Sequence, residues 1–562
     1  MKKDLPGGDS NHTEFNLTDY EKEYSTFSWE SAEKEIGWEK GAPVNVAHSC
    51  IDRHAACGKG ERTAMICTDG RKYTFSQLET LTNRFANLIK AIGVEKGERV
   101  ALFLPACPEF YISLLGTVKA GAIAVPIHSQ FMGDAVTGLF LDSQPALVVT
   151  STHLRNRIPD SEIPSIRRII VVGGGPGLDN WQSLVEGSDS GPATEWMDRE
   201  DPMLLMYTSG STGSPKGVIH VHGGAVQHRQ TGHWALDLKE GDIYWCTADP
   251  AWITGVSYGV WAPWLNGVSI LVDGSAPDPA RCYSLLEKYR VSVWYTTPSF
   301  LRHLMSAGSS PTVKTAFKHL RKILSVGEPL NPIIIRWCAM TFGQQVYDSW
   351  WMTETGGIMI TNFSCLPVKP GSMGKPVPGI YAAVVDEKGA ELPPLEMGQL
   401  AIRAGWPAMM RGIWRDEEKY NEYFSIPPWY LTGDLAYRDH DGYFWFQGRS
   451  DDIIKVNSQR IGPFEIESKL AAHPAIAEAG VIGKPDPVKG EIIKAFIVLK
   501  AGFDWSSKLD RQIREFIKAR LAPQMVPQEI EVCSSLPRTK NGKLLRRVLK
   551  SRELGLPTDE IN

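Results

Sequence analysis

The sequence has no surplus of positive charge, although the chain is long. Among its 562 residues, 60 Lys and Arg stand against 64 Asp and Glu, which gives a formal net charge of -4. Nonspecific binding to nucleic acid depends on basic side chains that neutralise phosphates. This composition therefore argues against DNA or RNA as a partner.

Long apolar runs and paired cysteines are also absent from the sequence. No stretch approaches the roughly 18 apolar residues of a membrane helix, and Met1–Pro6 does not continue into the apolar run of a signal peptide. The nine cysteines form no CxxC pair or Cys/His cluster, so neither a disulfide framework nor structural zinc is expected. These absences predict a cytoplasmic protein without a membrane partner.

The sequence is rich in alternating strand-like and helix-like segments. Between about Thr74 and Gly327, short apolar runs such as Val100–Leu104 and Leu204–Tyr207 alternate with amphipathic helical patterns. This alternation is typical of parallel sheets covered by helices, so the fold class is predicted to be α/β.

The pattern of predicted secondary structure changes twice towards the C-terminus. Residues 371–447 are β-rich with turn signals, which predicts an antiparallel or barrel-like subdomain. A short polar stretch near residue 450 precedes a separate set of strand and helix patterns, including a helix over Leu509–Leu521. We therefore predict a large N-terminal domain over 1–449 and a small α+β C-terminal domain over 450–562.

One Gly/Ser/Thr-rich loop carries the clearest chemical signal. Tyr207–Gly217 follows a strand-like run and combines glycines, hydroxyl side chains and Lys216 within a few residues. Glycines allow backbone N–H groups to approach an anion, hydroxyls donate further hydrogen bonds, and the lysine adds charge. The loop lacks the Gly-Lys-Ser/Thr ending of a Walker motif. It is therefore interpreted as a triphosphate-binding loop of another type, against the alternative of a flexible surface loop.

This loop resembles the phosphate loop of the adenylate-forming superfamily, which comprises acyl-CoA synthetases, adenylation domains and luciferases. The other motifs of that superfamily are matched in the expected order by Ser325–Pro329, Tyr347–Gly357, Tyr430–Asp434 with Gly448–Arg449, and Pro537–Lys543. The resemblance extends from about residue 45 to residue 550. It implies ATP, Mg²⁺ and coenzyme A as the cofactors and cosubstrates, and a small-molecule carboxylic acid as the substrate.

The resemblance also implies roles for individual residues. Asp434 is expected to accept hydrogen bonds from the ribose hydroxyls beside Arg449, although either residue alone could form an ordinary surface ion pair. Glu354 is a hard oxygen ligand suited to Mg²⁺. The predicted catalytic residues are Lys216, Glu354, Arg460 and Lys543. The predicted ATP- and AMP-binding residues are Thr208, Ser209, Gly210, Ser211, Thr212, Gly213, Lys216, Gly327, Glu328, Pro329, Asp348, Ser349, Trp350, Thr353, Asp434 and Arg449.

The acyl pocket is expected to be small. Trp350–Trp351 resembles the matching segment of the short-chain acetyl-CoA and propionyl-CoA synthetases, in which the second tryptophan closes the pocket. The alternative for Trp351 is an ordinary aromatic side chain of the core. An indole on the pocket floor excludes longer acids by overlap. The predicted pocket residues are Trp252, Ile253, Thr254, Val326 and Trp351.

The C-terminal domain is expected to rotate between two half-reactions. The resemblance implies Asp451 as the hinge and Lys543 as the lysine that acts in adenylate formation. It also implies Asn457, Ser458 and Lys518 as contacts of CoA. The resemblance further implies a protein lysine acetyltransferase or deacylase that acts on Lys543 as a protein partner.

The sequence thus predicts an AMP-forming acid–thiol ligase. Acetate or propionate, ATP and CoA would give acyl-CoA, AMP and pyrophosphate through an acyl-adenylate. Two alternatives stay open. One is a medium-chain, branched or aromatic acyl-CoA synthetase, because Gln459–Glu465 resembles the medium-chain synthetases more than the acetate enzymes. The other is an adenylation enzyme that loads a separate carrier protein. The sequence does not give the physiological direction.

Overall fold

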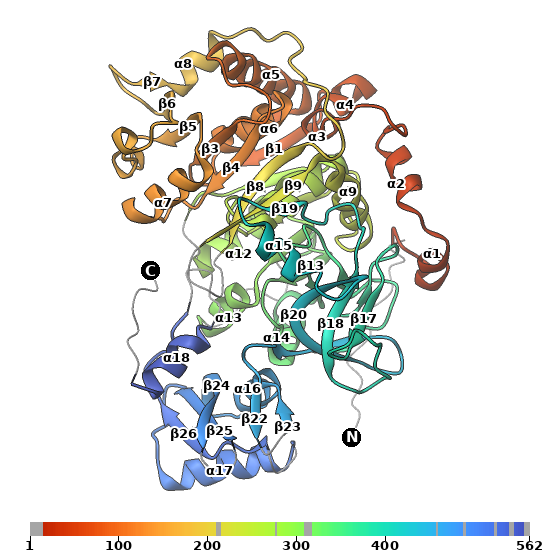
Figure 1. Ribbon diagram of the computed structural model, residues 1–562, viewed down its shortest axis with the longest axis vertical. Helices are drawn as coiled ribbons and strands as arrows, with labels where there is room; N and C mark the ends of the chain where they lie inside the picture. The colour runs from red at the N-terminus through yellow and green to blue at the C-terminus, as the bar shows by residue number, and fades with distance from the viewer. Residues whose placement is uncertain are drawn as a thin grey trace.

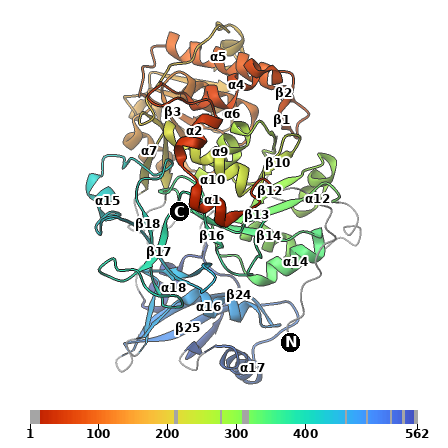
Figure 2. The ribbon, with the colours of Figure 1, turned by 90° about the vertical axis from the view of Figure 1, so that its right-hand side faces the viewer.

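The computed structural model describes residues 15–208, 215–275, 278–307, 317–456, 459–486, 490–521, 525–538 and 544–555. Figures 1 and 2 show a large N-terminal domain of sheets and helices above a smaller C-terminal domain that contains its own sheet. The predicted α/β fold class is confirmed. The boundary between residues 449 and 450 stays a prediction.

Two parallel-rich sheets form the N-terminal domain. The first has the order β16-β15-β14-β13-β12-β10-β11-β1-β2 and is parallel from β14 to β1. The second has the order β19-β9-β8-β4-β3-β5-β6-β7 and is parallel from β8 to β7. The strands of the first sheet are β1 (Thr63–Cys67), β2 (Lys72–Thr74), β10 (Ile243–Cys246), β11 (Ser269–Val272), β12 (Val293–Thr296), β13 (Lys322–Val326), β14 (Val346–Trp350), β15 (Ile360–Thr361) and β16 (Lys375–Pro376). Those of the second sheet are β3 (Arg99–Phe103), β4 (Ile123–Ile127), β5 (Leu147–Ser151), β6 (Arg168–Val172), β7 (Asp179–Asn180), β8 (Pro202–Thr208), β9 (Lys216–Val221) and β19 (Gly412–Ile413).

Two further sheets follow in the second half of the chain. The third sheet is antiparallel, with the order β17-β18-β20-β21, and lies in the region where an antiparallel subdomain was predicted. The fourth sheet belongs to the C-terminal domain and has the order β23-β22-β25-β24, with β26 parallel to β25. Their strands are β17 (Ala382–Val385), β18 (Gly398–Arg403), β20 (Trp429–Arg438), β21 (Phe444–Arg449), β22 (Ile454–Val456), β23 (Gln459–Ile461), β24 (Ile476–Asp486), β25 (Gly490–Leu499) and β26 (Glu529–Val532).

Helices cover the faces of these sheets (Figure 1). The α-helices are α1 (Tyr20–Thr26), α2 (Trp29–Glu35), α3 (Val46–Cys50), α4 (Asp52–His54), α5 (Phe75–Ala91), α6 (Pro108–Lys119), α7 (Gly133–Ser143), α8 (Trp181–Glu186), α9 (Ala225–Trp234), α10 (Ile253–Val256), α11 (Ala262–Leu265), α12 (Pro279–Lys288), α13 (Pro298–Ser306), α14 (Pro332–Phe342), α15 (Glu417–Glu422), α16 (Pro463–Ala471), α17 (Ser507–Lys518) and α18 (Arg546–Glu553). Short π and 3₁₀ segments are η1 (Ala55–Lys59), η2 (Arg155–Arg157), η3 (Asp160–Glu162), η4 (His222–Gly224) and η5 (Ser257–Trp261). None of the helices in the described ranges is both long and apolar enough to cross a membrane.

Helix α5 shows how local sequence produces this packing. Thr74 and Gln77 form a capping box at its N-terminus, and its buried face includes Leu78, Phe85 and Ile89 at helical spacing. Helix α6 packs closely against it, because a Cβ at Gly116 would lie 2.7 Å from a ring carbon of Phe85. The two helices therefore pack through a face where only a glycine fits.

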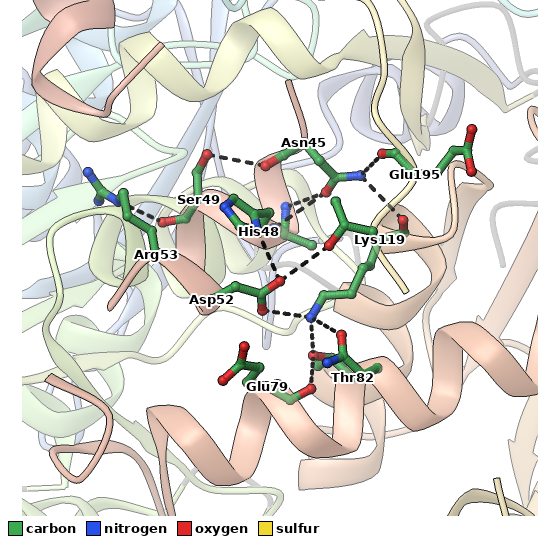
Figure 3. A network of polar contacts seen from close by, with 12 residues as sticks. Asn45, His48, Ser49, Asp52, Arg53, Glu79, Thr82, Lys119 and Glu195 are labelled. Carbon is green, nitrogen blue, oxygen red and sulfur yellow. Dashed lines mark hydrogen bonds and ion pairs between the residues drawn. The ribbon is translucent and has the colours of Figure 1, made fainter. Parts of the chain in front are cut away.

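A buried lysine joins three of these helices (Figure 3). Lys119, at the end of α6, is 0% exposed, and its Nζ lies 2.7 Å from an oxygen of Asp52 on α4. The same Nζ donates to Thr82 Oγ1 at 2.8 Å and to Asn83 Oδ1 at 2.9 Å on α5. All three ammonium protons thus have acceptors, which offsets the cost of burying the charge. No local pattern in the sequence indicated this pairing.

The strands on either side of the predicted phosphate loop belong to the second sheet. Strand β8 pairs antiparallel with β9, and Thr208 stands opposite Lys216 in the register. The prediction of a strand before the loop is confirmed. The antiparallel strand that follows the loop was not predicted, because the alternating pattern suggested parallel neighbours throughout.

The segment that follows β21 contacts both β21 and the helices of the C-terminal domain. Phe446 and Phe464 make an edge-to-face contact with ring centroids 5.7 Å apart. The domain has its own core, in which Ile513 and Ile517 of α17 pack with residues of β22, β24 and β25. Arg546 on α18 pairs with Asp452, just after β21, at 2.9 Å.

Candidate active site

Lys216 lies in a polar cluster at the start of β9. Its Nζ donates a hydrogen bond to the Tyr423 hydroxyl at 3.1 Å and lies 5.6 Å from the centre of the Tyr423 ring. Burial lowers the pKa of Lys216, whereas the nearby Glu354 carboxylate acts in the opposite direction. Strand β9 therefore holds a partly enclosed cation at the end of the predicted phosphate loop.

Tyr423 connects Lys216 to the predicted magnesium ligand. Its hydroxyl donates to Glu354 Oε1 at 3.0 Å, and its ring stacks on Tyr430 with centroids 5.4 Å apart. Glu354 is 7% exposed. Sequence reasoning missed Tyr423, which follows α15 and lies outside every motif that the resemblance identified.

A tight turn holds the segment that contains Glu354. Gly356 has a φ of +72°, and a Cβ there would lie 2.0 Å from the carbonyl oxygen of Ala408. The Gly356 carbonyl accepts from His228 Nε2 at 2.8 Å and from Ser257 Oγ at 3.1 Å. No residue other than glycine fits this turn, so the position of Glu354 depends on it.

Asp434 and Arg449 form a cross-strand pair in the third sheet. They stand opposite each other on β20 and β21, and Arg449 Nη1 lies 2.9 Å from Asp434 Oδ1. Trp350 Nε1 donates to the other carboxylate oxygen at 2.9 Å. Asp434 is 5% exposed, and the pKa of Arg449 is raised mainly by Asp434 and Asp451, against the effect of burial. The structure thus brings together three residues that the sequence assigned to nucleotide binding.

The matched motif Ser325–Pro329, which holds three of the predicted ATP- and AMP-binding residues, begins within β13 and continues into the turn after it. Gly327 has a φ of +88°, and Arg302 Nη2 lies 2.6 Å from Glu328 Oε2. On the neighbouring strand β14, Asp348 accepts a hydrogen bond from Ser325 Oγ, and burial raises the pKa of Asp348 to about 7. The carboxyl ends of two adjacent parallel strands therefore carry these residues, as ligand sites of open α/β sheets do.

The Trp351 side chain is fixed by hydrogen bonding and ring contacts. Its Nε1 donates to the Tyr295 hydroxyl at 3.1 Å, and Tyr295 shares a 2.7 Å hydrogen bond with Ser349 Oγ. The Tyr258 ring meets the Trp351 ring edge-on, with centroids 5.0 Å apart. Sequence reasoning missed Tyr295 and Tyr258, because nothing local marks them as neighbours of Trp351.

The other predicted pocket residues lie in different surroundings. Ile253, on α10, and Val326, at the end of β13, are buried in the same core cluster as Trp351. Trp252 instead stacks on His128, with ring centroids 5.8 Å apart. Thr254 is partly exposed on α10. Ile253, Val326 and Trp351 are thus the predicted pocket residues that are buried in the main apolar core of the N-terminal domain.

Several predicted residues lie wholly or partly outside the described part of the structure. Arg460 belongs to β23, but its side chain is not described. Two other predicted residues of this region are described. Lys518 ends α17 and is exposed, and a carboxylate oxygen of Asp451 lies 3.9 Å from Arg449 Nε. The residues outside the described ranges are Ser209, Gly210, Ser211, Thr212, Gly213, Asn457, Ser458 and Lys543.

Comparison with known proteins identifies the family. The profile of the AMP-binding enzyme family matches residues 51–414, and the profile of the AMP-binding enzyme C-terminal domain matches residues 465–543. The chain belongs to the AMP-binding enzyme family. Its predicted membership in the adenylate-forming superfamily is confirmed.

Two relatives of similar length are acetyl-coenzyme A synthetases. That of Bacillus subtilis strain 168 is 49% identical over 568 residues, which cover 100% of this chain and 99% of the relative. That of Methanothrix thermoacetophila is 40% identical and covers 93% of this chain and 85% of the relative. These matches confirm the predicted enzyme class, an AMP-forming acid–CoA ligase.

Solved structures of similar fold include an anthranilate CoA ligase in complex with anthranoyl-AMP. It is 29% identical, with a TM-score of 0.84, and covers 91% of this chain and 98% of its own. A benzoate CoA ligase from Burkholderia xenovorans is 26% identical, with a TM-score of 0.81, and covers 90% of this chain and 100% of its own. The agreement extends over both domains of the fold.

Proposed function

We propose that this enzyme is an AMP-forming short-chain acyl-CoA synthetase, with acetate as its first substrate and propionate as its second. The observation that carries the acid preference is the Trp351 indole, which is 7% exposed and held by Tyr295 and Tyr258. An indole fixed in this way resists displacement by a longer chain. The acetyl-coenzyme A synthetases among the relatives support the same assignment.

The first half-reaction forms the mixed anhydride. A carboxylate oxygen of the acid attacks the α-phosphorus of ATP, and pyrophosphate leaves. Asp434 and Arg449 would hold the ribose, and Lys216 would place positive charge beside the phosphates. Because Lys216 and Glu354 share the Tyr423 hydroxyl, the cation and the carboxylate are positioned before ATP binds.

Glu354 fits the role of a ligand for Mg²⁺ that binds together with ATP. It is a hard carboxylate in a largely buried position, and no cluster of three or more His, Cys, Asp or Glu suited to a metal occurs within the described ranges. Mg²⁺ is commonly held by one or two carboxylates together with substrate phosphates and water. When bound, the ion would neutralise charge on the phosphate oxygens.

The second half-reaction requires a different surface of the C-terminal domain. The thiol sulfur of CoA attacks the acyl carbon of the adenylate, AMP leaves, and the thiol proton is released. We propose that this domain, residues 450–562, rotates about Asp451 and presents Lys543 for the first step and the segment around Arg460 for the second. Asn457, Ser458 and Lys518 are proposed CoA contacts. Acetylation of Lys543 by a protein acetyltransferase would cancel its charge and block the first step, and a deacylase would restore it.

The substrate is tested by steady-state kinetics with acids of two to eight carbons and with benzoate. AMP, pyrophosphate and acyl-CoA are quantified in the forward direction, and ATP in the reverse direction. We expect the highest kcat/KM for acetate, with propionate second. A maximum at six or eight carbons, or with benzoate, would favour the medium-chain or aromatic alternative. Adenylate formation without transfer to CoA would favour a carrier-loading enzyme.

The domain rotation is tested by measuring the half-reactions separately with Lys543→Ala. Pyrophosphate release without CoA should fall about 100-fold or more, because one charged group that stabilises the transition state is lost. Conversion of supplied acetyl-adenylate and CoA to acetyl-CoA should be nearly unchanged. Equal losses in the two assays would contradict the rotation without affecting the assignment of the overall reaction.

A further inference from the structure

Arg546, the first residue of α18, connects the C-terminal domain to the chain that leaves β21. Its Nη1 donates to Asp452 Oδ2 at 2.9 Å. Its Nε and Nη2 donate to the two carboxylate oxygens of Glu467 on α16, at 3.0 Å and 2.6 Å. Glu467 Oε1 also accepts from the main-chain N–H of Val481 on β24 at 2.8 Å. One guanidinium therefore joins α16, α18 and β24 to the residue that follows the proposed hinge.

The surroundings of Arg546 show that these contacts, and not the helix, account for its position. The side chains of Arg546, Glu467 and Asp452 are 17%, 10% and 24% exposed. Burial raises the pKa of Asp452, and Arg546 acts in the opposite direction. A cation at the first residue of a helix is disfavoured by the helix dipole. The two carboxylate partners provide the compensation that a largely enclosed cation needs.

The residues before the proposed hinge are attached to the N-terminal domain instead. The main-chain N–H of Ser450 donates to the carbonyl oxygen of Gly433 on β20 at 2.8 Å. Arg449 ends β21 and pairs with Asp434 across the same two strands. Ser450 is thus held by the sheet that carries the candidate nucleotide-binding pair.

Asp451 lies between these two attachments. Its side chain is 59% exposed, and its carboxylate lies 3.9 Å from Arg449 Nε, which is beyond hydrogen-bond distance. A main-chain hydrogen bond from Asp452 N to the Arg449 carbonyl, at 3.1 Å, closes the turn around Asp451. A change in the backbone angles of Asp451 would open this turn and leave the attachments of Ser450 and Asp452 intact.

We infer that Arg546 is a positioning residue that fixes Asp452 to the C-terminal domain and so confines the domain rotation to Asp451. The inference rests on the rotation proposed above and names the contact that makes it precise. Without this contact Asp452 would turn as well, and two successive mobile residues would allow the domain a wider range of orientations. Arg546 follows Lys543 by three residues, so the contact also lies close in sequence to the lysine that the rotation would present.

The inference is tested with Asp452→Asn, which removes the carboxylate charge at the hinge and leaves Arg546 paired with Glu467. Asp510→Asn is the matched control, because it is the same substitution in the same domain. Asp510 accepts from Arg514 Nε at 2.9 Å, but both residues belong to α17. Figure 1 shows α16 and α18 on the side of the C-terminal domain that faces the N-terminal domain, whereas α17 lies on the far side.

The readout is the distribution of distances between two spin labels on the full-length enzyme, measured by pulsed electron paramagnetic resonance. The labels replace Met340 on α14 and Phe503 before α17, which are 70% and 44% exposed. They are attached through unnatural amino acids, because the chain contains nine cysteines. The enzyme is saturated with acetyl sulfamoyl-adenosine, a non-hydrolysable analogue of the adenylate, and measured with and without CoA. Both half-reactions and the thermal midpoint are measured for each variant.

We expect the wild type and Asp510→Asn to give a narrow distribution in each state, and Asp452→Asn to give a broader one in both. Pyrophosphate release without CoA and thioester formation from supplied acetyl-adenylate should each fall about tenfold in Asp452→Asn, since a misplacement of about 1 Å can cost roughly 100-fold in rate. Its thermal midpoint should match that of the control.

A wild-type width in Asp452→Asn, equal broadening in Asp510→Asn, or loss of one half-reaction alone would overturn the inference. A failure of the proposed rotation would look different. In that case CoA would leave the wild-type distance unchanged, and the role of Arg546 would be decided by the width of that single distance in the two variants.

Discussion

Replacing Trp351 with glycine should change the chain-length preference of the enzyme. The indole is buried, donates to Tyr295 at 3.1 Å and contacts the Tyr258 ring. Its removal should open space for several methylene groups. Acetate should lose the surface that holds its methyl group, whereas hexanoate should gain burial of carbons that the wild type excludes.

The size of this effect follows from the area that is buried. Each methylene contributes about 0.8 kcal/mol on burial, so hexanoate has up to about 3 kcal/mol to gain over acetate from its four additional carbons. Incomplete filling of the cavity reduces the expected swing to about 2–3 kcal/mol. The ratio of kcat/KM for hexanoate to that for acetate should therefore rise about 30- to 150-fold.

The assay is kcat/KM for each acid from two to eight carbons, together with the thermal midpoint of each variant. Trp351→Gly should also lose stability, since truncating a buried tryptophan costs about 3–5 kcal/mol. Trp294→Phe is the control, because Trp294 is buried on the opposite face of β12 from Tyr295. The control should lower stability and keep the wild-type ranking of acids. A folded Trp351→Gly variant with that same ranking would refute the assignment of Trp351 to the pocket floor.

Three further predictions concern the nucleotide site and the buried histidines. Asp434→Ala should weaken AMP binding by roughly 2–4 kcal/mol in calorimetry, because it removes a charged acceptor, and should leave the acid ranking unchanged. Tyr423→Phe should raise KM for ATP and slow pyrophosphate release, with thioester formation from supplied acetyl-adenylate unchanged; equal slowing of both would contradict a positioning role. Burial lowers the pKa values of His220, His222 and His228 to about 3, 4 and 4, below the 6.5 of the unfolded chain. The stability that these neutral histidines contribute above pH 6.5 should therefore be lost as the pH falls towards 4. In denaturant titrations, His222→Gln should reduce the slope of the free energy of unfolding against pH by about 1.4 kcal/mol per pH unit.

Much of the fold could be predicted because its signals are local. The pattern over Leu509–Leu521 predicted a helix that the structure places at Ser507–Lys518, and the run Leu204–Tyr207 lies within β8. Periodicity fixes the type of such elements because one face must be buried. It does not fix strand pairing, so the antiparallel return through β9 was missed.

The candidate site could be predicted only where its residues belong to motifs. Asp434 and Arg449 were assigned to the same nucleotide, and the structure shows them as cross-strand neighbours. Tyr423 and Tyr295 were missed because each acts on a residue far away in the sequence: Tyr423 is 69 residues from Glu354, and Tyr295 is 56 residues from Trp351. Such contacts arise where the fold brings together strands and loops that are far apart in the chain, which a single sequence does not reveal.

Two adjacent tryptophans show how the fold keeps acid selection separate from nucleotide binding. Trp350 ends β14 and donates to Asp434 in the third sheet, whereas Trp351 donates to Tyr295 in the first sheet. Neighbouring residues of an extended chain point in opposite directions, so one indole faces each site. A change in the acid pocket should therefore alter the ranking of acids more than the affinity for AMP, and a change at Asp434 should do the reverse. A register shift of one residue in this strand would misplace both indoles at once, which makes the pairing of β14 with β13 a shared requirement of the two sites.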